Sequence, residues 1–384
     1  MPVRVSSKSL PFTSADLRHY KLLAEFQERL EPILRAAPST PTEQDPRRKL
    51  LPGDYFSLML FALLNPAIKS ARALCGASHF DRLQKEEVCR EPVSLASFSE
   101  MQSLADPELL AGLLRSLSEE AVPVFGDPRL REKVSELIAN DGTLLPALPR
   151  MAWALWQNPQ NRAGKLHLEF SVWRQAPVEF TVTDGNASER AVWKAKLRRG
   201  VCYVNDRNYS HDYRLIEEVA AVGATFVLRL HNNAILTPLE PARALSAEDC
   251  KAGVVEDVRV RLGQEPNGPA GRLVRVETQG HVFLLFTNLE DLPAELVGLI
   301  YRYRWQIELF FKWIKCILGC CHLLAESQQG VTIQIYCALI ASVLLVLWTG
   351  AKPTKRQWEA LQLYWMGWAT LAELEKILSP KTKK

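Results

Sequence analysis

The stretch LIYRYRWQIELFFKWIKCILG, Leu299 to Gly319, has the composition of a buried helix and yet carries several charged and hydrogen-bonding side chains. Because an α-helix turns about 100° per residue, most of these polar side chains fall on one stripe about 80° wide. A helix that is otherwise apolar nearly all round is buried, and a carboxylate within it needs a cationic partner or a metal ion. The stretch therefore predicts either an internal ion-pair network or a functional site. The residues of the stripe are Tyr301, Arg304, Glu308, Lys312 and Lys315.

The bulk composition is that of an ordinary globular protein. The chain has 384 residues, of which 47% are hydrophobic and 23% are charged, so it can hold several domains. Its net charge of +4 permits a nucleic-acid partner without requiring one, because basic groups matter only where they cluster. The N-terminal sequence MPVRVSSKSLPF lacks the apolar run of a secretion signal, and the eight cysteines are scattered, so we expect a reducing cytoplasm.

Two local features have competing explanations. The group Cys316, Cys320, Cys321 and His322 lacks the paired spacing typical of zinc sites, so we expect ordinary thiols there. The uncharged segment VTIQIYCALIASVLLVLWT, Val331 to Thr349, is almost long enough to cross a bilayer. Because it stands alone and its polar residues reduce its hydrophobicity, we expect a core helix that covers a sheet, and no membrane association.

Residues 1–128 show helical periodicity and no convincing series of strands. Asp106 followed by Pro107 is a typical helix start. Basic residues such as Arg47 and Arg48 can contact phosphates, although a solvated face is the more common explanation of such charges. We therefore predict an α-helical N-terminal domain that binds DNA.

From Val134 onward the pattern changes to short strands and helices. The expected strands are SELIAND, which ends at Asp141, then KLHLEFSV, VEFTVT, VCYVND, which ends at Asp206, and ATFVLRL. Between them lie the helices ERAVWKAKL, capped by Ser188, and HDYRLIEEVAAV, capped by Ser210 and ended by Gly223. This order indicates an α/β fold with a mixed sheet, whose first three strands are antiparallel and whose later strands are joined by crossovers.

A segment rich in proline and glycine follows Leu230 and contains three more candidate strands, VVEDVRVRL, RLVRVE and HVFLLFT. We interpret it as a β-rich insertion, after which the Glu308 helix is entered through Pro293. The predicted parts after the N-terminal domain are 129–235 for the first part of the core, 236–290 for the insertion, 291–350 for the second part of the core, and 351–384 for a C-terminal helical tail.

Three carboxylates of this arrangement are expected to meet. Asp141 and Asp206 each end an apolar strand, where α/β sheets place ligand groups, and Glu308 comes from a helix that packs on the sheet. Gathered carboxylates repel one another unless a divalent cation neutralises them, and hard oxygen ligands suit Mg²⁺ or Mn²⁺. A pair of such ions can activate a water or a 3′-hydroxyl and stabilise the leaving oxygen. Taken alone, an aspartate before Gly142 or Arg207 is more commonly a turn or cap residue.

With these residues in place, the sequence resembles the bacterial insertion-sequence transposases of the fourth group, which carry a DDE active site on a ribonuclease-H-like fold. The resemblance runs from about Ser94 to Val346. The sequences NDGT and NDRNYS match the regions of the two aspartates. The most specific part is the spacing Tyr, two residues, Arg, three residues, Glu, six residues, Lys, which is matched by Tyr301, Arg304, Glu308 and Lys315.

The resemblance implies a cut-and-paste DNA transposase that hydrolyses the phosphodiester at the element ends and joins the freed 3′-hydroxyls to target DNA. It implies that Asp141, Asp206 and Glu308 hold two Mg²⁺ or Mn²⁺ ions. It also implies double-stranded DNA as the partner, a homodimer in the synaptic complex, and a cytoplasmic location at the nucleoid. The residues expected to grip the DNA end are Tyr301, Arg304 and Lys315.

Other interpretations stay open at this point. The family usually has Gly or Ala where this chain has Asn208, and Asn tolerates a left-handed backbone better than most residues. Trp305 can help to stack a flipped end base or can belong to the core. The alternative functions are a nuclease or resolvase of the same fold that lacks strand transfer, and a catalytically inactive DNA-binding protein derived from a transposase.

Overall fold

The computed structural model describes residues 21–38, 45, 47–123, 125–158, 161–264, 268–317, 323–349 and 354–378. It divides into two compact units. The first holds the described residues up to Ala121, the segment Leu145–Gly164, and the described residues from Lys312 onward. The second holds Val122–Leu144 and Lys165–Phe311. The side chains of Cys316, Cys320, Cys321 and His322 lie outside the described residues, so the expectation of ordinary thiols stays a prediction there.

The first unit is built mainly from helices. Serine side chains begin two of them, because Ser70 and Ser94 accept hydrogen bonds from the first-turn N–H groups of Ala73 and Ser97, both at 3.1 Å. The helical character predicted for the N-terminal region is therefore confirmed over its described residues. The helices are α2 (Lys21–Ala36), α3 (Pro52–Leu64), α4 (Ala71–Ala77), α5 (Asp81–Lys85), α6 (Leu95–Leu104), α7 (Glu108–Glu120), α14 (Gln328–Thr349), α15 (Lys355–Trp365) and α16 (Leu371–Leu378), and the short strand β2 (Leu155–Asn158) also belongs to this unit.

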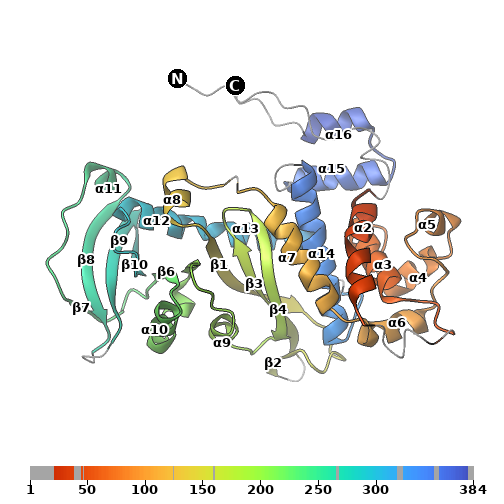
Figure 1. Ribbon diagram of the computed structural model, residues 1–384, viewed down its shortest axis with the longest axis horizontal. Helices are drawn as coiled ribbons and strands as arrows, with labels where there is room; N and C mark the ends of the chain where they lie inside the picture. The colour runs from red at the N-terminus through yellow and green to blue at the C-terminus, as the bar shows by residue number, and fades with distance from the viewer. Residues whose placement is uncertain are drawn as a thin grey trace. The chain divides into compact units, whose positions relative to one another are not determined.

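Helix α14 forms the core of the first unit. It is the described helix that is long and apolar enough to cross a membrane by length and composition, and 83% of its apolar window is buried inside the protein. It contacts α2, α3, α6 and α7, as Figure 1 shows for this bundle. The Gln334 carboxamide within it accepts a hydrogen bond from the Leu324 N–H at 2.8 Å. The expectation of a core helix is confirmed, and the helices that it contacts belong to the first unit.

The second unit is organised around a mixed sheet. Strand β1 (Leu137–Pro146) pairs in parallel with β5 (Cys202–Asn205), which pairs in parallel with β6 (Thr225–Arg229). On the other side, β1 neighbours β3 (Asn161–Ser171), which pairs with β4 (Ala176–Asp184). The order β4-β3-β1-β5-β6 is that of a ribonuclease-H-like sheet, so the predicted fold class is confirmed.

The two short helices of this sheet begin at side-chain caps. Helix α9 (Glu189–Lys194) begins at Ser188, whose hydroxyl accepts a hydrogen bond from the Ala191 N–H, as predicted. Helix α10 (Tyr213–Ala221) begins at Asp212, whose carboxylate accepts from the Leu215 N–H at 3.2 Å. The predicted cap at Ser210 is therefore wrong, because Ser210 ends the 3₁₀ turn η1 (Arg207–Tyr209). Gly223 ends the α10 region as predicted, with a positive φ of 75°.

The segment after β6 extends the same sheet. The three predicted strands are present as β8 (Val254–Leu262), β9 (Ala270–Thr278) and β10 (His281–Thr287), preceded by the short β7 (Leu236–Pro238). Strand β10 pairs antiparallel with β6, with Leu285 opposite Arg229, so the strand order continues as β6-β10-β9-β8-β7 (Figure 1). The insertion is thus part of the sheet that carries the candidate site.

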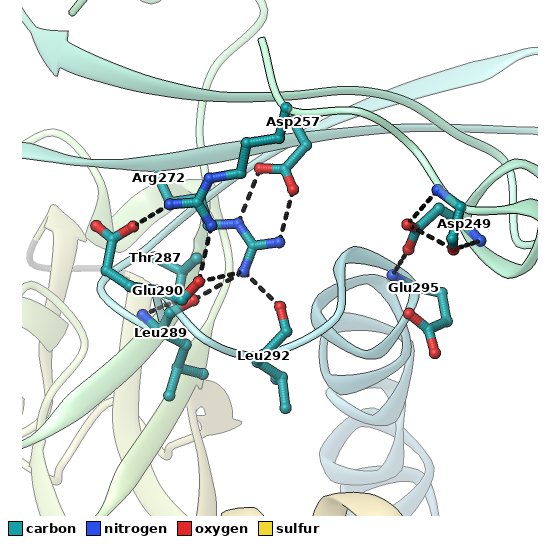
Figure 2. A network of polar contacts seen from close by, with 10 residues as sticks. Asp249, Asp257, Arg272, Thr287, Leu289, Glu290, Leu292 and Glu295 are labelled. Carbon is teal, nitrogen blue, oxygen red and sulfur yellow. Dashed lines mark hydrogen bonds and ion pairs between the residues drawn. The ribbon is translucent and has the colours of Figure 1, made fainter. Parts of the chain in front are cut away.

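A buried polar network holds the loop that connects β10 to the next helix, α12 (Ala294–Tyr303). Arg272 on β9 is 2% exposed and forms a two-pronged ion pair with Asp257 on β8, at 2.8 and 2.7 Å. Its remaining N–H groups point at the backbone carbonyls of the connecting loop, as Figure 2 shows. These acceptors are the carbonyls of Leu289, Glu290 and Leu292.

A second contact fixes the start of α12. The Asp249 carboxylate, from α11 (Ala247–Lys251), accepts a hydrogen bond from the Glu295 N–H at 2.8 Å (Figure 2). Together with the Arg272 network, it ties the first turn of α12 to the extended part of the sheet. The helix that leads to Glu308 is therefore anchored by the segment that the sequence presents as an insertion.

The polar stripe lies on two helices that meet at Arg304. Helix α12 ends at Tyr303, and α13 (Trp305–Ile317) begins one residue after Arg304. At the junction the Arg304 N–H bonds to the Tyr301 carbonyl at 3.1 Å and the Ile307 N–H to the Arg304 carbonyl at 3.2 Å, which is 3₁₀ spacing. The continuous helix expected from Leu299 is therefore wrong at this residue.

Tertiary contacts hold the last residue of α12. The Tyr303 hydroxyl accepts a hydrogen bond from the Asp127 N–H at 3.0 Å, immediately before α8 (Pro128–Lys133). The Tyr303 ring also packs edge-on against Phe125 and Trp173, with ring centroids 5.0 and 5.9 Å apart. These contacts fix the last turn of α12, while the Arg304 backbone stays in the right-handed helical region.

Candidate active site

Asp141 lies within β1, beyond the part of that strand that pairs with β5. The pairing extends only as far as Ala139 opposite Val204, and β1 continues to Pro146, so the prediction that the strand ends at Asp141 is wrong. The Asp141 carboxylate accepts a hydrogen bond from the Gly142 N–H at 2.8 Å. Burial raises the pKa of this carboxyl to about 7, which the Gly142 hydrogen bond and Arg304 oppose.

Asp206 directly follows β5, as predicted. Its carboxylate accepts a hydrogen bond from the Asn208 N–H at 2.9 Å and so begins the η1 turn. Its negative charge is one of the influences that raise the pKa of Asp141. The charges of the two aspartates therefore interact, and the strands that carry them, β1 and β5, are adjacent and parallel.

Two buried asparagines join these strands immediately before the aspartates. The Asn205 carboxamide oxygen accepts hydrogen bonds from the Asn140 backbone N–H at 3.2 Å and from its side-chain amide at 3.1 Å. Asn140 is 5% exposed and Asn205 is fully buried. This contact fixes the register that brings Asp141 and Asp206 together. Sequence reasoning missed both asparagines, although the repeated Asn-Asp dipeptide was an available signal.

Arg304 connects the helical part of the site to the sheet. Its guanidinium bonds to Glu308 at 2.5 Å and lies 4.0 Å from the carboxylate of Asp141. The Arg304 side chain is 12% exposed, and its Nε atom is buried without a hydrogen-bond partner. The arrangement thus brings Asp141 and Glu308 to the same arginine. It contains part of the ion-pair network that was one of the two interpretations of the stripe.

The rest of the stripe divides between the two units. The Tyr301 ring lies 5.8 Å from the Arg304 guanidinium carbon, in the second unit. Lys312 is exposed and Lys315 is half-buried, and both fall in the first unit. Trp305 is 48% exposed, so the core position considered for it is wrong.

A fourth carboxylate, Glu189 at the start of α9, lies beside the first aspartate. A Cβ atom on Gly142 would approach the Glu189 carboxylate to 2.7 Å, so a larger residue there would require the Glu189 side chain to shift. Glu189 also pairs with Lys165 at 3.6 Å and accepts a hydrogen bond from the Asn208 carboxamide at 3.0 Å. Its charge adds to the raised pKa of Asp141. Sequence reasoning gave Glu189 no role, because only the folded chain brings α9 to β1.

The geometry at Asn208 differs from the expectation. We considered a left-handed backbone there, but Asn208 lies in the 3₁₀ turn η1 and is not among the described residues with positive φ. Its backbone N–H bonds to Asp206 and its side chain to Glu189. The residue therefore links the loop after β5 to α9 by its side chain, and no unusual backbone conformation is needed.

The donor set can be compared with that of a metal site. Asp141, Asp206, Glu308 and Glu189 offer hard oxygen ligands, which suit a divalent cation. Within the described ranges, however, no three His, Cys, Asp or Glu side chains stand close enough together to hold one metal ion. Arg304 supplies a positive charge among these carboxylates, because it contacts Glu308 and lies near Asp141.

Comparison with known proteins gives consistent results. The protein y4zB of Sinorhizobium fredii (strain NBRC 101917 / NGR234), named as a transposase, is 30% identical over 220 residues, which are 56% of this chain and 61% of that protein. A transposase for insertion sequence element IS5377 of Geobacillus stearothermophilus is 27% identical over 212 residues, which are 54% of this chain and 55% of that protein. The matches thus span less than two thirds of the length of these relatives.

One solved structure and one family also match. The piggyBac transposase synaptic complex with hairpin DNA matches with a TM-score of 0.41 and 12% identity, covering 97% of this chain and 84% of that chain, which is too distant to carry an argument. The family model described as the transposase DDE domain matches residues 132–344, which include Asp141, Asp206 and Glu308. Because this match covers more than half of the chain, the protein belongs to the transposase DDE domain family.

Proposed function

We propose that this protein is a DNA transposase, which hydrolyses phosphodiester bonds at the ends of an insertion sequence and joins the freed 3′-hydroxyls to target DNA. The observation that carries the proposal is the meeting of Asp141 and Asp206 on adjacent parallel strands, with Glu308 brought to the first of them through Arg304. All three carboxylates lie within the family match.

We assign Asp141, Asp206 and Glu308 as the residues that hold Mg²⁺ or Mn²⁺, two ions in all. Burial of Asp141 and the neighbouring carboxylates raise its pKa to about 7, so its ionised form lacks sufficient counter-charge within the protein. A carboxyl group in that state gains from a divalent cation, which supports the assignment. When bound, such ions activate a water or a 3′-hydroxyl and stabilise the leaving oxygen.

Arg304 has two roles in the proposed site. Without DNA it pairs with Glu308 and limits the repulsion between that carboxylate and Asp141. With DNA it binds a phosphate near the cut, because a guanidinium suits two phosphate oxygens at once. Tyr301 and Lys315 complete the grip on the DNA end, and the closeness of Tyr301 to Arg304 supports a shared role for these two side chains. These side chains orient the strand so that the scissile phosphate lies against the carboxylates.

The remaining parts of the proposal follow from the reaction. The substrates are double-stranded DNA of the element ends and of the target, and two copies of the chain hold the two ends in a synaptic complex. The protein acts in the bacterial cytoplasm at the nucleoid.

The test uses the purified chain and a labelled duplex from the DNA that flanks its gene. With Mg²⁺ we expect cleavage at the element end and joining to a target plasmid, and with EDTA we expect binding alone. Asp141→Ala, Asp206→Ala and Glu308→Ala should each reduce cleavage by at least about 10²-fold and leave binding largely intact. Cleavage that survives in any two of them would refute the site, and cleavage without joining would indicate a nuclease.

A further inference from the structure

Four basic side chains gather beyond the carboxyl ends of β5 and β6, next to Asp206 but apart from the carboxylates. Two come from the loop after β5, where one lies in η1 and the other precedes α10. Two come from the end of β6 and the turn that follows it. We call them the basic cluster; its members are Arg207, His211, Arg229 and His231.

Direct contacts hold the basic cluster together. The rings of His211 and His231 stack with their centroids 4.1 Å apart and their planes at 36°. Arg207 also lies close enough to the His231 ring to influence its pKa. Burial lowers the pKa of His231, and the charges of His211, Arg207 and Arg229 lower it further. The charged side chains named among the main influences on the pKa of this ring are all basic, so basic groups gather at this edge of the sheet.

Within the described residues, neither arginine of the basic cluster forms a salt bridge. Arg198, Arg243 and Arg272 of the same unit, by contrast, each face an aspartate or a glutamate. The Nε atom of Arg229 and the Nε2 atom of His231 are buried without a hydrogen-bond partner. Basic side chains without an ion pair among the described residues suit an anionic acceptor from outside the protein.

A row of cations and rings leads from the basic cluster to the candidate active site. The guanidinium carbon of Arg229 lies 4.7 Å from the centre of the Phe283 ring, and Phe283 lies 5.8 Å from the Tyr301 ring. Tyr301 in turn lies 5.8 Å from the guanidinium carbon of Arg304. Alternating basic and aromatic side chains are typical of surfaces that follow a nucleic-acid strand.

We propose that the basic cluster binds backbone phosphates of the DNA strand that passes Asp206 and Glu308. The inference rests on the proposed function and adds a contact region that the transposase signature does not contain. The guanidinium groups of Arg207 and Arg229 take phosphate oxygens. The contact is to phosphate and carries no base specificity, so any duplex of sufficient length shows it.

The test measures binding of a fluorescent duplex by anisotropy in EDTA, so that cleavage plays no part. The dissociation constant is followed between about 50 and about 200 mM salt. Arg207→Ala and Arg229→Met should each weaken binding and reduce the log–log salt slope by about one, and methionine keeps the packing on Phe283. Arg207→Lys should restore most of the slope. Lys251→Ala, an exposed lysine on α11, is the matched control and should leave the slope unchanged.

The outcomes of this test separate the basic cluster from the proposed function. If the unaltered chain binds no duplex, the proposed function fails. If it binds, but Arg207→Ala and Arg229→Met behave like Lys251→Ala, the basic cluster is not a phosphate site and the proposed function stands. Thermal melts of each variant confirm that it is folded.

Discussion

Two arginine–carboxylate groups in the second unit look alike in sequence and differ in structure. Arg272 and Asp257 are 2% and 4% exposed, and the arginine donors not used by Asp257 reach backbone carbonyls (Figure 2). Arg304 bonds one carboxylate, stands 4.0 Å from a second, and keeps a buried Nε atom without a partner. The first group is closed, while the second has unfilled bonding capacity.

The difference identifies which group is available for a ligand. A buried ion pair with its bonds filled has nothing to exchange, and breaking it leaves a charge stranded in the core. A group with an unfilled donor and a carboxyl whose pKa is raised to about 7 can accept a cation or a phosphate at lower cost. The Arg272 group therefore anchors the helix, and the Arg304 group belongs to the proposed site at its far end.

The largest effect is expected for Arg272→Ala. It leaves Asp257 buried without its cation, so the free energy of unfolding should fall by about 3–5 kcal/mol in urea titrations. The matched control is Arg275→Ala on the same strand, whose ion pair with Glu256 is more exposed and should contribute less than about 1 kcal/mol. Equal losses in the two variants would show that the Arg272 group is not closed.

The second effect concerns pH and Asp141. Its pKa is raised to about 7 from an ordinary value of 3.8, so between these pH values the folded state holds a proton that the unfolded state has released. Stability should therefore fall as pH rises through this window and change little above it. At about pH 8 and without metal, Asp141→Asn should be more stable than the unaltered chain by about 2 kcal/mol, roughly half the full linkage value because the side chain is 23% exposed.

Urea titrations at about pH 4 and about pH 8 check this second prediction. The Asn variant has no carboxyl proton to lose at this position, so its advantage should be present at the higher pH and absent at the lower one. An advantage of the same size at both pH values would mean that the change acts through packing. The pKa of Asp141 would then not be raised in the folded chain.

The third effect tests the Arg304 group directly. Arg304→Ala should cost only about 1 kcal/mol of stability, because Glu308 is 28% exposed and water can reach it. The same variant, and Lys315→Ala, should each reduce the salt slope of DNA binding by about one. The control for both measurements is Arg302→Ala, which changes an exposed arginine of α12. A large loss of stability with an unchanged slope would make the Arg304 group structural as well.

The sequence predicts well those features that depend on neighbouring residues. Strand alternation located β5, β6 and the three long strands of the insertion, and Gly223 marked the end of α10 through its positive φ. The spacing of Tyr301, Arg304 and Glu308 correctly grouped these side chains, since the helix turns by a similar angle even across the junction at Arg304. These are local consequences of side-chain periodicity.

Other features depend on contacts between distant segments and could not be predicted. The hydrogen bond from the Asp127 N–H to the Tyr303 hydroxyl at the end of α12 joins residues that are 176 apart. The approach of Glu189 to Gly142 exists only after α9 has packed on the sheet. Ser210 and Asp212 are both acceptable caps by sequence, and the fold selects Asp212. Such choices between equivalent local solutions are made by tertiary packing.

The smallest effect is expected at Asn208, where the structure and the family pattern lead to opposite results. If the loop needed a left-handed backbone, Asn208→Gly would stabilise it, because glycine adopts positive φ at no cost. In the structure the backbone is ordinary and the Asn208 side chain bonds to Glu189 at 3.0 Å, so glycine removes a hydrogen bond and adds freedom to the unfolded chain. Asn208→Gly should therefore lower the free energy of unfolding by about 1 kcal/mol. A double-mutant cycle of Asn208→Ala with Glu189→Ala measures the bond itself, and a coupling energy near zero would remove the structural reason for Asn at this position.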